Sequence, residues 1–140
     1  MSWTLQLSYE RPPKGLSANW RGHWATKSRS TAEVRALVKH LARAAGIRPM
    51  GRMQVELVWV VSDHRRRDED NIYPLLKACA DGLAADKGVS ARLVPDDTPE
   101  WCVKRAPRIE HRKNTTPHFE LIVTDITHRP DAVDQITRRL

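Results

Sequence analysis

Residues 53–62 read MQVELVWVVS and run directly into DHRRRDEDN at 63–71. The first segment alternates apolar residues on one side, and Val58 and Val60 make its other side partly apolar. Such alternation is typical of a β-strand, and apolar residues on both sides indicate a position in the middle of a sheet. The second segment contains no apolar residue and cannot be core. The sequence therefore predicts a central strand that ends in a highly charged loop.

A helix is predicted to begin at Ser30, before that strand. Ser30 and Glu33 have the spacing of a capping box, and Gly46 followed by Pro49 predicts the end of the helix. Its apolar residues fall on one face, which we expect to be buried: Val34, Leu37, Val38, Leu41 and Ala45.

A second helix is predicted to begin near Pro74, after the charged loop, because proline is tolerated in the first turn of a helix. Lys77 and Asp81 are four residues apart and share a face of this helix. The opposite face is expected to bury Leu76, Cys79, Ala80 and Leu83.

Three more segments have the pattern of β-strands. Residues 3–8 alternate and stop before two prolines, and residues 101–112 and 118–126 are predicted to form a hairpin around 114–117.

The order of these elements predicts an α+β fold, with a small mixed sheet of about four strands and two main helices. The length of 140 residues fits a single domain over 1–140. The last segment, 131–140, is expected to be either a short helix or a frayed tail.

The formal charge of +7 is unevenly distributed along the chain. Residues 1–67 carry 13 Lys and Arg against 4 Asp and Glu, and residues 101–140 carry 8 against 5. Residues 68–100 between them carry only 3 basic residues against 8 acidic ones. An acidic segment inside a basic chain indicates either ordinary solvated charge or a divalent-metal site on a surface that binds a polyanion.

Paired carboxylates in the acidic segment support the metal site. Asp68 and Asp70 are two residues apart after a strand, and Asp96 and Asp97 come from a later loop. If they converge, hard oxygen ligands favour Mg²⁺, with Mn²⁺ as a substitute, and the substrate is expected to be a phosphodiester. Lys77 is then placed to stabilise charge on the phosphorus or the leaving oxygen, and Asp81 to orient it.

Several of these residues also have ordinary explanations. The arginines at 65–67 are typical of a solvated surface, or they hold a nucleic-acid backbone. Continued strand alternation would place Arg65 and Arg67 beside Asp63, with Arg66 facing away. Trp20 and Trp24 belong either to the core and its edges or to a base-stacking surface.

The run RRRDEDN at 65–71, followed by Lys77, by DGL at 81–83 and by Asp96-Asp97, resembles the RusA-type Holliday-junction resolvases, which are common in phages and prophages. Pro12-Pro13 and Asn19 also fit the amino-terminal pattern of this family. Between Asn71 and Lys77 the chain has three more residues than the family pattern, which is about 300° of helix, so the lysine is only about 60° from its expected face.

The resemblance implies a homodimeric, Mg²⁺-dependent endonuclease that cuts four-way DNA junctions. It implies that Asp68, Asp70 and Asp97 bind the metal, that Lys77 is catalytic, and that Asp81 and Asp96 are auxiliary. DNA contacts are expected from Arg65, Arg67, Asn19 and Arg21.

Two other functions fit the same residues: a nuclease for flaps or other branched DNA, and a nucleic-acid-binding module without catalysis. The sequence also shows no long apolar run and no basic leader, and Cys79 and Cys102 have no metal-ligand spacing. We therefore expect reduced thiols and a location in the cytoplasm of a bacterial or phage-infected cell.

Overall fold

The computed structural model describes residues 1–128, so the segment predicted at 131–140 lies outside the described residues. The described part contains five strands, two α-helices and one short 3-10 helix. In chain order they are β1 (Ser2–Leu7), α1 (Trp24–Ala44), β2 (Met53–Val61), η1 (Glu69–Ile72), α2 (Tyr73–Ala84), β3 (Cys102–Lys104), β4 (Arg108–His111) and β5 (His118–Asp125).

The strands form one mixed sheet with β2 in its centre. On one side of β2 lies β5, and on the other side of β5 lies β1. The β2–β5 and β5–β1 pairings are both antiparallel. On the other side β2 pairs in parallel with β3 at its start and with β4 at its end. The predicted α+β class and the central position of 53–62 are confirmed, and the sheet has five strands where about four were expected.

The predicted hairpin of 101–112 with 118–126 is wrong. β4 and β5 are consecutive in the chain, but they lie on opposite sides of β2. Alternation along a segment indicates which face is buried and leaves its neighbour undetermined. Here β5 pairs along Met53 to Val60 of β2, and this extensive pairing leaves the opposite edge of β2 for β3 and β4.

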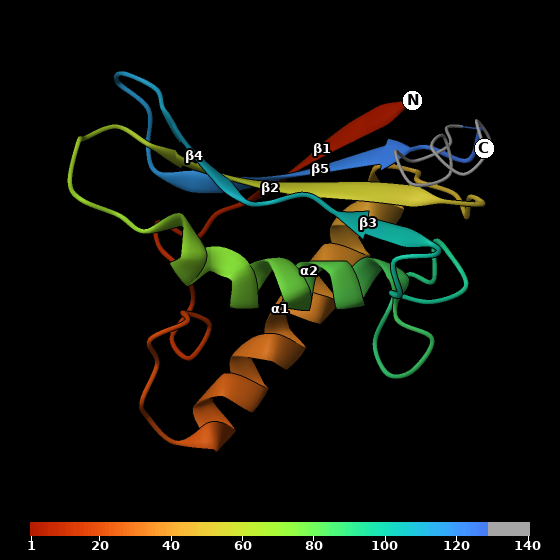
Figure 1. The fold of residues 1–140 in the computed structure, drawn as a ribbon, viewed down its shortest axis with the longest axis horizontal. Helices are drawn as coiled ribbons and strands as arrows, with labels where there is room; N and C mark the ends of the chain where they lie inside the picture. Colours follow the sequence, from red (N-terminus) through yellow and green to blue (C-terminus); the bar gives the residue numbers. More distant parts are fainter. Residues whose placement is uncertain (129–140) are drawn as a thin grey trace, which may run out of the picture.

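Both α-helices lie on one face of the sheet, with α2 next to the strands (Figure 1). Between the layers, one cluster of buried side chains includes Val38 of α1, Leu83 of α2 and Leu57 of β2. The two helices approach closely at Gly82, where an added Cβ would lie 2.9 Å from the Cα of Arg35. This packing fixes α2, which carries Lys77 and Asp81, against the central strand.

α1 begins six residues earlier than predicted. His23 is its N-cap, and its Nδ1 accepts a hydrogen bond from the backbone N–H of Ala25 at 3.1 Å. The Ser30 hydroxyl instead donates to the carbonyl oxygen of Lys14. Ser30 and Glu33 therefore have the spacing of a capping box, but Ser30 does not cap the helix. The predicted end is confirmed, since the helix stops at Ala44 and Gly46 adopts a φ of +72°.

The prediction for the second helix is confirmed in both its start and its buried face. α2 begins at Tyr73 with Pro74 in its first turn. The residues expected to be buried are all buried: Leu76, Cys79, Ala80 and Leu83.

Both cysteines are free and buried, and burial raises the pKa of the Cys102 thiol to about 11. A thiol in such surroundings stays protonated and unreactive, as expected for a core residue. Within residues 1–128, no helix is long and apolar enough to cross a membrane.

Candidate functional site

Lys77 and Asp81 lie on successive turns of α2. The distance from Lys77 Nζ to Asp81 Oδ2 is 3.7 Å. The lysine side chain is 70% exposed, whereas the Asp81 side chain is 15% exposed. The ammonium group can therefore reach a ligand in solvent while the carboxyl group lies at the edge of the core.

The loop after α2 brings two further carboxylates to the end of the helix. Asp96 Oδ1 accepts a hydrogen bond from the backbone N–H of Asp97 at 2.7 Å, so Asp96 shapes the turn. Lys104 Nζ donates to the backbone carbonyl of Asp97 at 3.0 Å. These contacts place the Asp97 carboxyl group beside that of Asp81.

The pKa values of the two neighbouring carboxyl groups are shifted in opposite directions. Burial, followed by the hydrogen bond with Asp97, raises the pKa of Asp81. The same hydrogen bond lowers the pKa of Asp97, and the nearby Asp96, Lys104 and Lys77 act in the same direction. At neutral pH Asp97 is therefore ionised, and Asp81 is the member of the pair that retains a proton more readily.

Asp81 also has an unsatisfied oxygen. Its Oδ1 is buried and makes no hydrogen bond with a polar donor of the described chain. A buried carboxyl oxygen without a partner is costly, and it is satisfied either by a proton shared with Asp97 or by a cation. Lys77 faces the other oxygen of the same group.

A groove of about 630 Å³ opens next to this pair. Its polar lining residues include Lys77, Asp81 and Lys104, while Leu16 and Leu76 contribute apolar surface. Tyr73 also lines the groove and is 46% exposed. The groove is thus an open, largely apolar hollow with three lysines, Lys27, Lys77 and Lys104, and one carboxyl group on its walls.

The predicted set of metal ligands does not come together. Asp68 is the N-cap of η1, and its Oδ1 accepts the backbone N–H of Asp70 at 3.0 Å. Both residues are exposed at the start of α2. Asp97 lies near Asp81 in the last turn, and the helix rises by about 12 Å from Tyr73 to Asp81.

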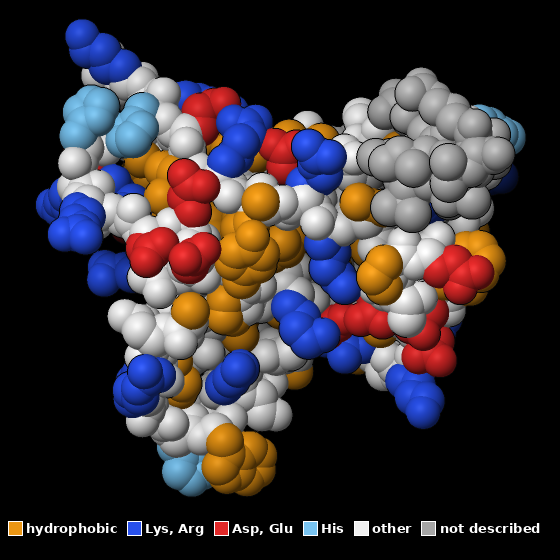
Figure 2. All heavy atoms as spheres, viewed as in Figure 1, with side chains coloured by type: hydrophobic (Ala, Val, Ile, Leu, Met, Phe, Trp, Pro, Cys, Tyr) orange, Lys and Arg blue, Asp and Glu red, His pale blue; other side chains and the backbone are white. Residues whose placement is uncertain are grey.

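Oxygens that share one Mg²⁺ lie within about 4 Å of each other, and the described residues show no such contact between Asp97 and either Asp68 or Asp70. No group of three or more His, Cys, Asp or Glu residues within 1–128 is arranged to hold a metal. On the face shown in Figure 2, acidic side chains at the two ends of α2 are separated by hydrophobic and basic side chains. The described structure thus places Asp68 and Asp70 at the start of α2 and Asp97 near its end, and the binding of one metal ion by all three stays a prediction.

A smaller metal site fits the chain. Mg²⁺ is commonly bound by one or two carboxylates, with water and substrate phosphates completing its shell. Asp81 and Asp97 supply two adjacent carboxyl groups, and the unsatisfied Oδ1 of Asp81 belongs to this pair. The residues that fit a magnesium ion are therefore Asp81 and Asp97.

The three arginines of the charged loop are not oriented as predicted. Arg65 and Arg67 both contact the Asp63 carboxylate, as strand alternation implied. However, the pocket of about 480 Å³ next to Asp68 is lined by Arg66 and Arg67, together with Arg11. Arg66 therefore lies beside an acidic residue of the loop, and its predicted orientation away from that region is wrong.

Arg67 is held in place by two interactions. Its Nη2 lies 2.7 Å from Asp63 Oδ1, and its guanidinium carbon lies 5.3 Å from the centroid of the Trp59 ring. Its side chain is only 14% exposed. Asn19 and Arg21 are exposed in the loop between β1 and α1, where Arg21 donates to the carbonyl of Trp20.

Sequence reasoning missed three basic residues at these sites: Lys27, Lys104 and Arg11. Lys104 ends β3, and it reaches Asp97 because β3 lies in register with the start of β2. Its only sequence signal is its basic charge after a short apolar segment. Arg11 reaches its pocket through the course of the loop after β1, which no local pattern encodes.

Comparison with known proteins adds little to this description. No family model matches the chain. An uncharacterized protein of Xylella fastidiosa (strain Temecula1) is 29% identical over 91 residues, which are 61% of this chain and 60% of the relative. The chain thus spans about three fifths of the length of that relative.

Proposed function

We propose that this protein is a Mg²⁺-dependent structure-specific endodeoxyribonuclease that resolves four-way DNA junctions by phosphodiester hydrolysis. In this proposal it acts in DNA recombination and repair, in the cytoplasm of a bacterial or phage-infected cell. The observation that carries the proposal is the Asp81–Asp97 pair, which lies beside Lys77 on a chain of net charge +7. The resemblance of 65–97 to the RusA-type resolvases supports the same activity.

Each side chain of the site has a role in this reaction. Asp81 and Asp97 would hold Mg²⁺, which supplies Lewis-acid stabilisation of a phosphate oxygen when bound. Asp97, whose pKa is lowered, stays ionised, so it is available as a metal ligand and can accept a hydrogen bond from the attacking water. Lys77 is exposed and can donate a hydrogen bond to a phosphate oxygen or to the leaving oxygen. Asp81 restricts the position of its ammonium group.

A symmetric dimer suits this substrate, because two related cuts are needed to resolve a four-way junction. The homodimer is part of the proposal. It also offers one way for Asp68 and Asp70 of one subunit to act near the Asp97 of another. Sedimentation of the protein with and without junction DNA tests the dimer directly.

The central test is cleavage of a synthetic four-way junction with and without EDTA. We expect EDTA to abolish cleavage, and we expect Asp97→Asn to reduce it by about 100-fold or more while junction binding is retained. Asp86→Asn is the matched control, because Asp86 is an exposed acid in the same loop region and lines none of the described pockets. Unchanged cleavage by Asp97→Asn would rule out this site.

Asp70→Asn separates the two acidic groups in the same assay. If the Asp81–Asp97 pair acts alone, the substitution leaves the rate of cleavage within a few-fold of the wild type. Loss of cleavage in both variants would instead indicate that the two acidic groups act together, as they could across the two subunits of a homodimer.

A nucleic-acid-binding module without catalysis is the second candidate. It is favoured by one observation: Asp68 caps η1 and Asp70 is exposed, as in an ordinary structural turn. This alternative predicts salt-sensitive DNA binding with no Mg²⁺-dependent cuts. A panel of flap, fork and four-way substrates tests the remaining alternative, a nuclease for other branched DNA.

A further inference from the structure

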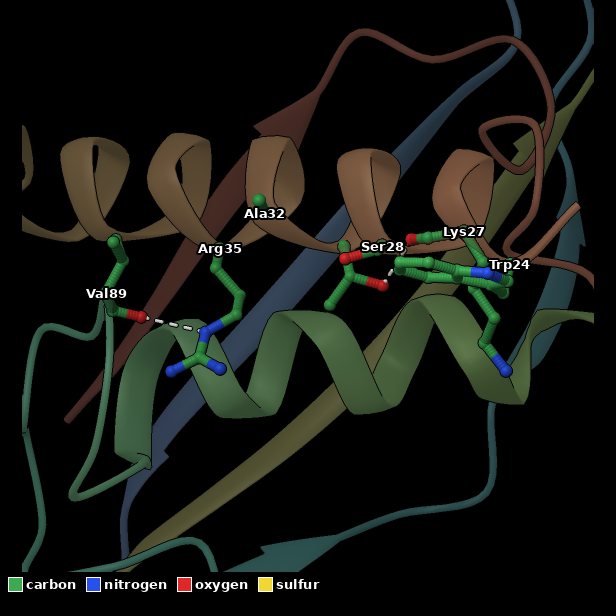
Figure 3. A pocket seen from close by; sticks show the side chains of 7 residues that line it. Trp24, Lys27, Ser28, Ala32, Arg35 and Val89 are labelled. Atoms are coloured by element: carbon green, nitrogen blue, oxygen red, sulfur yellow. Dashed lines mark hydrogen bonds between the residues drawn. The ribbon is translucent and has the colours of Figure 1, made fainter.

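A second hollow lies on the side of α1 that faces α2. Its volume is about 460 Å³, and its lining includes Trp24, Lys27, Arg35 and Val89. Figure 3 shows the labelled side chains of α1 in a row along this side of the helix, with Trp24 at one end and Arg35 at the other. We call this hollow the Trp24 groove.

Trp24 is unusually exposed for an aromatic residue, with 74% of its surface accessible. The His23 ring stacks against its indole, with ring centroids 5.6 Å apart and an angle of 29° between the rings. His23 is itself fixed, because its Nδ1 accepts the backbone N–H of Ala25. The indole is therefore supported by a fixed neighbour while most of its surface faces solvent.

Trp20 differs from Trp24. It is half-buried, and Lys14 Nζ lies 5.9 Å from the centroid of its ring. Of the two tryptophans in this basic segment, Trp24 is the one that offers an open aromatic surface.

The Trp24 groove adjoins the groove at the candidate active site. Both are lined by Lys27 and Thr31, so the two hollows lie next to each other on the surface. Together their linings contain four basic residues, Lys27, Arg35, Lys77 and Lys104, and one acidic residue, Asp81. An apolar path with basic walls and an exposed aromatic ring complements a polyanion that carries flat bases.

Arg35 gives part of this path a fixed wall. Its Nε donates to the carbonyl of Val89 at 2.9 Å, and its Nη2 donates to the carbonyl of Lys87 at 2.6 Å. These bonds attach the loop after α2 to α1 and hold the guanidinium at the edge of the groove. The positive charge there is thus positioned by the fold.

We propose that the Trp24 groove binds an unpaired DNA strand, with one base stacked on Trp24 and its phosphates near Lys27 and Arg35. The strand then continues toward Asp81 and Asp97. A base can stack on a side chain only after it leaves the duplex, so the groove selects DNA with unpaired nucleotides, such as an opened branch point. This inference rests on the proposed function in taking DNA as the ligand.

The test is DNA binding measured by fluorescence anisotropy in EDTA, so that no cleavage is required. The probes are a labelled single strand, the matched duplex and a four-way junction. We expect Trp24→Ala to raise the Kd for the single strand by about fivefold to 100-fold, and to change the Kd for the duplex by less than about twofold. Trp24→Phe keeps an aromatic ring and is expected to recover most of the affinity.

Lys27→Ala tests the phosphate contact. We expect it to weaken binding of the single strand and the junction by about threefold to tenfold. Arg29→Ala is the matched control, since Arg29 is exposed two residues further along α1, about 200° around the helix, and does not line the groove. A larger effect from Arg29 than from Lys27 would contradict the assigned path.

Equal affinity of wild type and Trp24→Ala for the single strand would overturn the inference, as would a wild type that binds no single strand. Sedimentation of the same variants detects a different occupant: if Trp24→Ala dissociates a dimer, the groove contacts a second copy of the chain and the inference is overturned. Junction cleavage distinguishes the two proposals. If the wild type cuts junctions and Trp24→Ala binds single strands normally, only the proposed binding in the Trp24 groove is refuted. If DNA binds through Trp24 but no junction is cut, only the proposed nuclease activity is refuted.

Discussion

At the scale of single residues, Asp81 and Glu120 are two carboxyl groups placed in opposite electrostatic surroundings. Asp81 lies at a buried edge beside another carboxyl group, so its pKa rises. Glu120 accepts hydrogen bonds from Nη1 and Nη2 of Arg112 at 2.7 and 2.8 Å and also contacts His118, so its pKa falls to about 2. Asp81 is available for chemistry, whereas Glu120 contributes to the stability of the strand ends.

Glu120 gives a prediction for stability against pH. Its folded-state pKa lies below its ordinary value of 4.5, so its contribution is present above that value and is lost as the pH falls toward 2. We expect Glu120→Gln to lower the free energy of unfolding by about 1–3 kcal/mol at neutral pH, and by progressively less between about pH 5 and pH 2. Urea unfolding across this range measures the difference.

Glu100→Gln is the control for this measurement, because Glu100 is an exposed acid with no hydrogen bond or ion pair in the described structure. Its stability should follow that of the wild type at every pH. A constant difference between wild type and Glu120→Gln across the acid range would contradict the assigned role of ionised Glu120.

The residue scale also shows how far the sequence could anticipate the candidate site. The four-residue step from Lys77 to Asp81 predicted their shared face, because helical geometry fixes it locally. The meeting of Asp81 with Asp97 depends on the path of the loop over 85–101, which no periodicity encodes. The same spacing rule that suggested convergence for Asp68 and Asp70 could not reveal that Asp68 would cap η1.

At the scale of elements, the contact between α1 and α2 determines where the candidate site lies. Gly82 allows the backbone of α1 to approach, because its missing side chain leaves room next to Arg35. Glycine is otherwise unfavourable inside a helix, where alanine is better by about 1 kcal/mol. The presence of glycine at 82 is therefore explained by the close approach of the two helices.

Gly82→Ala tests this explanation, because close packing and helix propensity predict opposite signs for the change in the free energy of unfolding. A Cβ at position 82 would lie 2.9 Å from both the Cα and the carbonyl oxygen of Arg35, and backbone atoms cannot easily move away. We expect the free energy of unfolding to fall by about 1–3 kcal/mol, as in other overpacked cores. Chemical denaturation gives the value, and an increase in stability, as helix propensity alone predicts, would show that the helices can separate at no cost.

Elements were predicted well where their signals are local. The start of α2 followed from Pro74, and the central position of β2 followed from apolar residues on both of its faces. The start of α1 and the partner of β4 were predicted wrongly. A histidine cap at position 23 competes with a stronger sequence pattern at Ser30, and strand pairing is a property of the whole sheet.

At the scale of the whole molecule, positive charge is expected to dominate DNA binding. Lys27, Arg35, Lys77 and Lys104 line the two adjoining grooves, and each phosphate contact contributes about −0.9 to the slope of log K against log salt. We therefore expect a slope of roughly −3 to −4 for junction binding. Titration at several salt concentrations measures this slope, and Lys27→Ala should reduce its size by about one.

The order of strands has a consequence for how the protein folds during synthesis. Within the described chain β1 has β5 as its one neighbour, and β5 in turn lies between β1 and β2. Of the described strands, β1 leaves the ribosome before the others, and it must wait for β5 before it can join the sheet. Until about residue 125 has emerged, the backbone edges of β1 and β2 that pair with β5 have no partner. A nascent chain stalled before that point should be sensitive to proteases and dependent on chaperones.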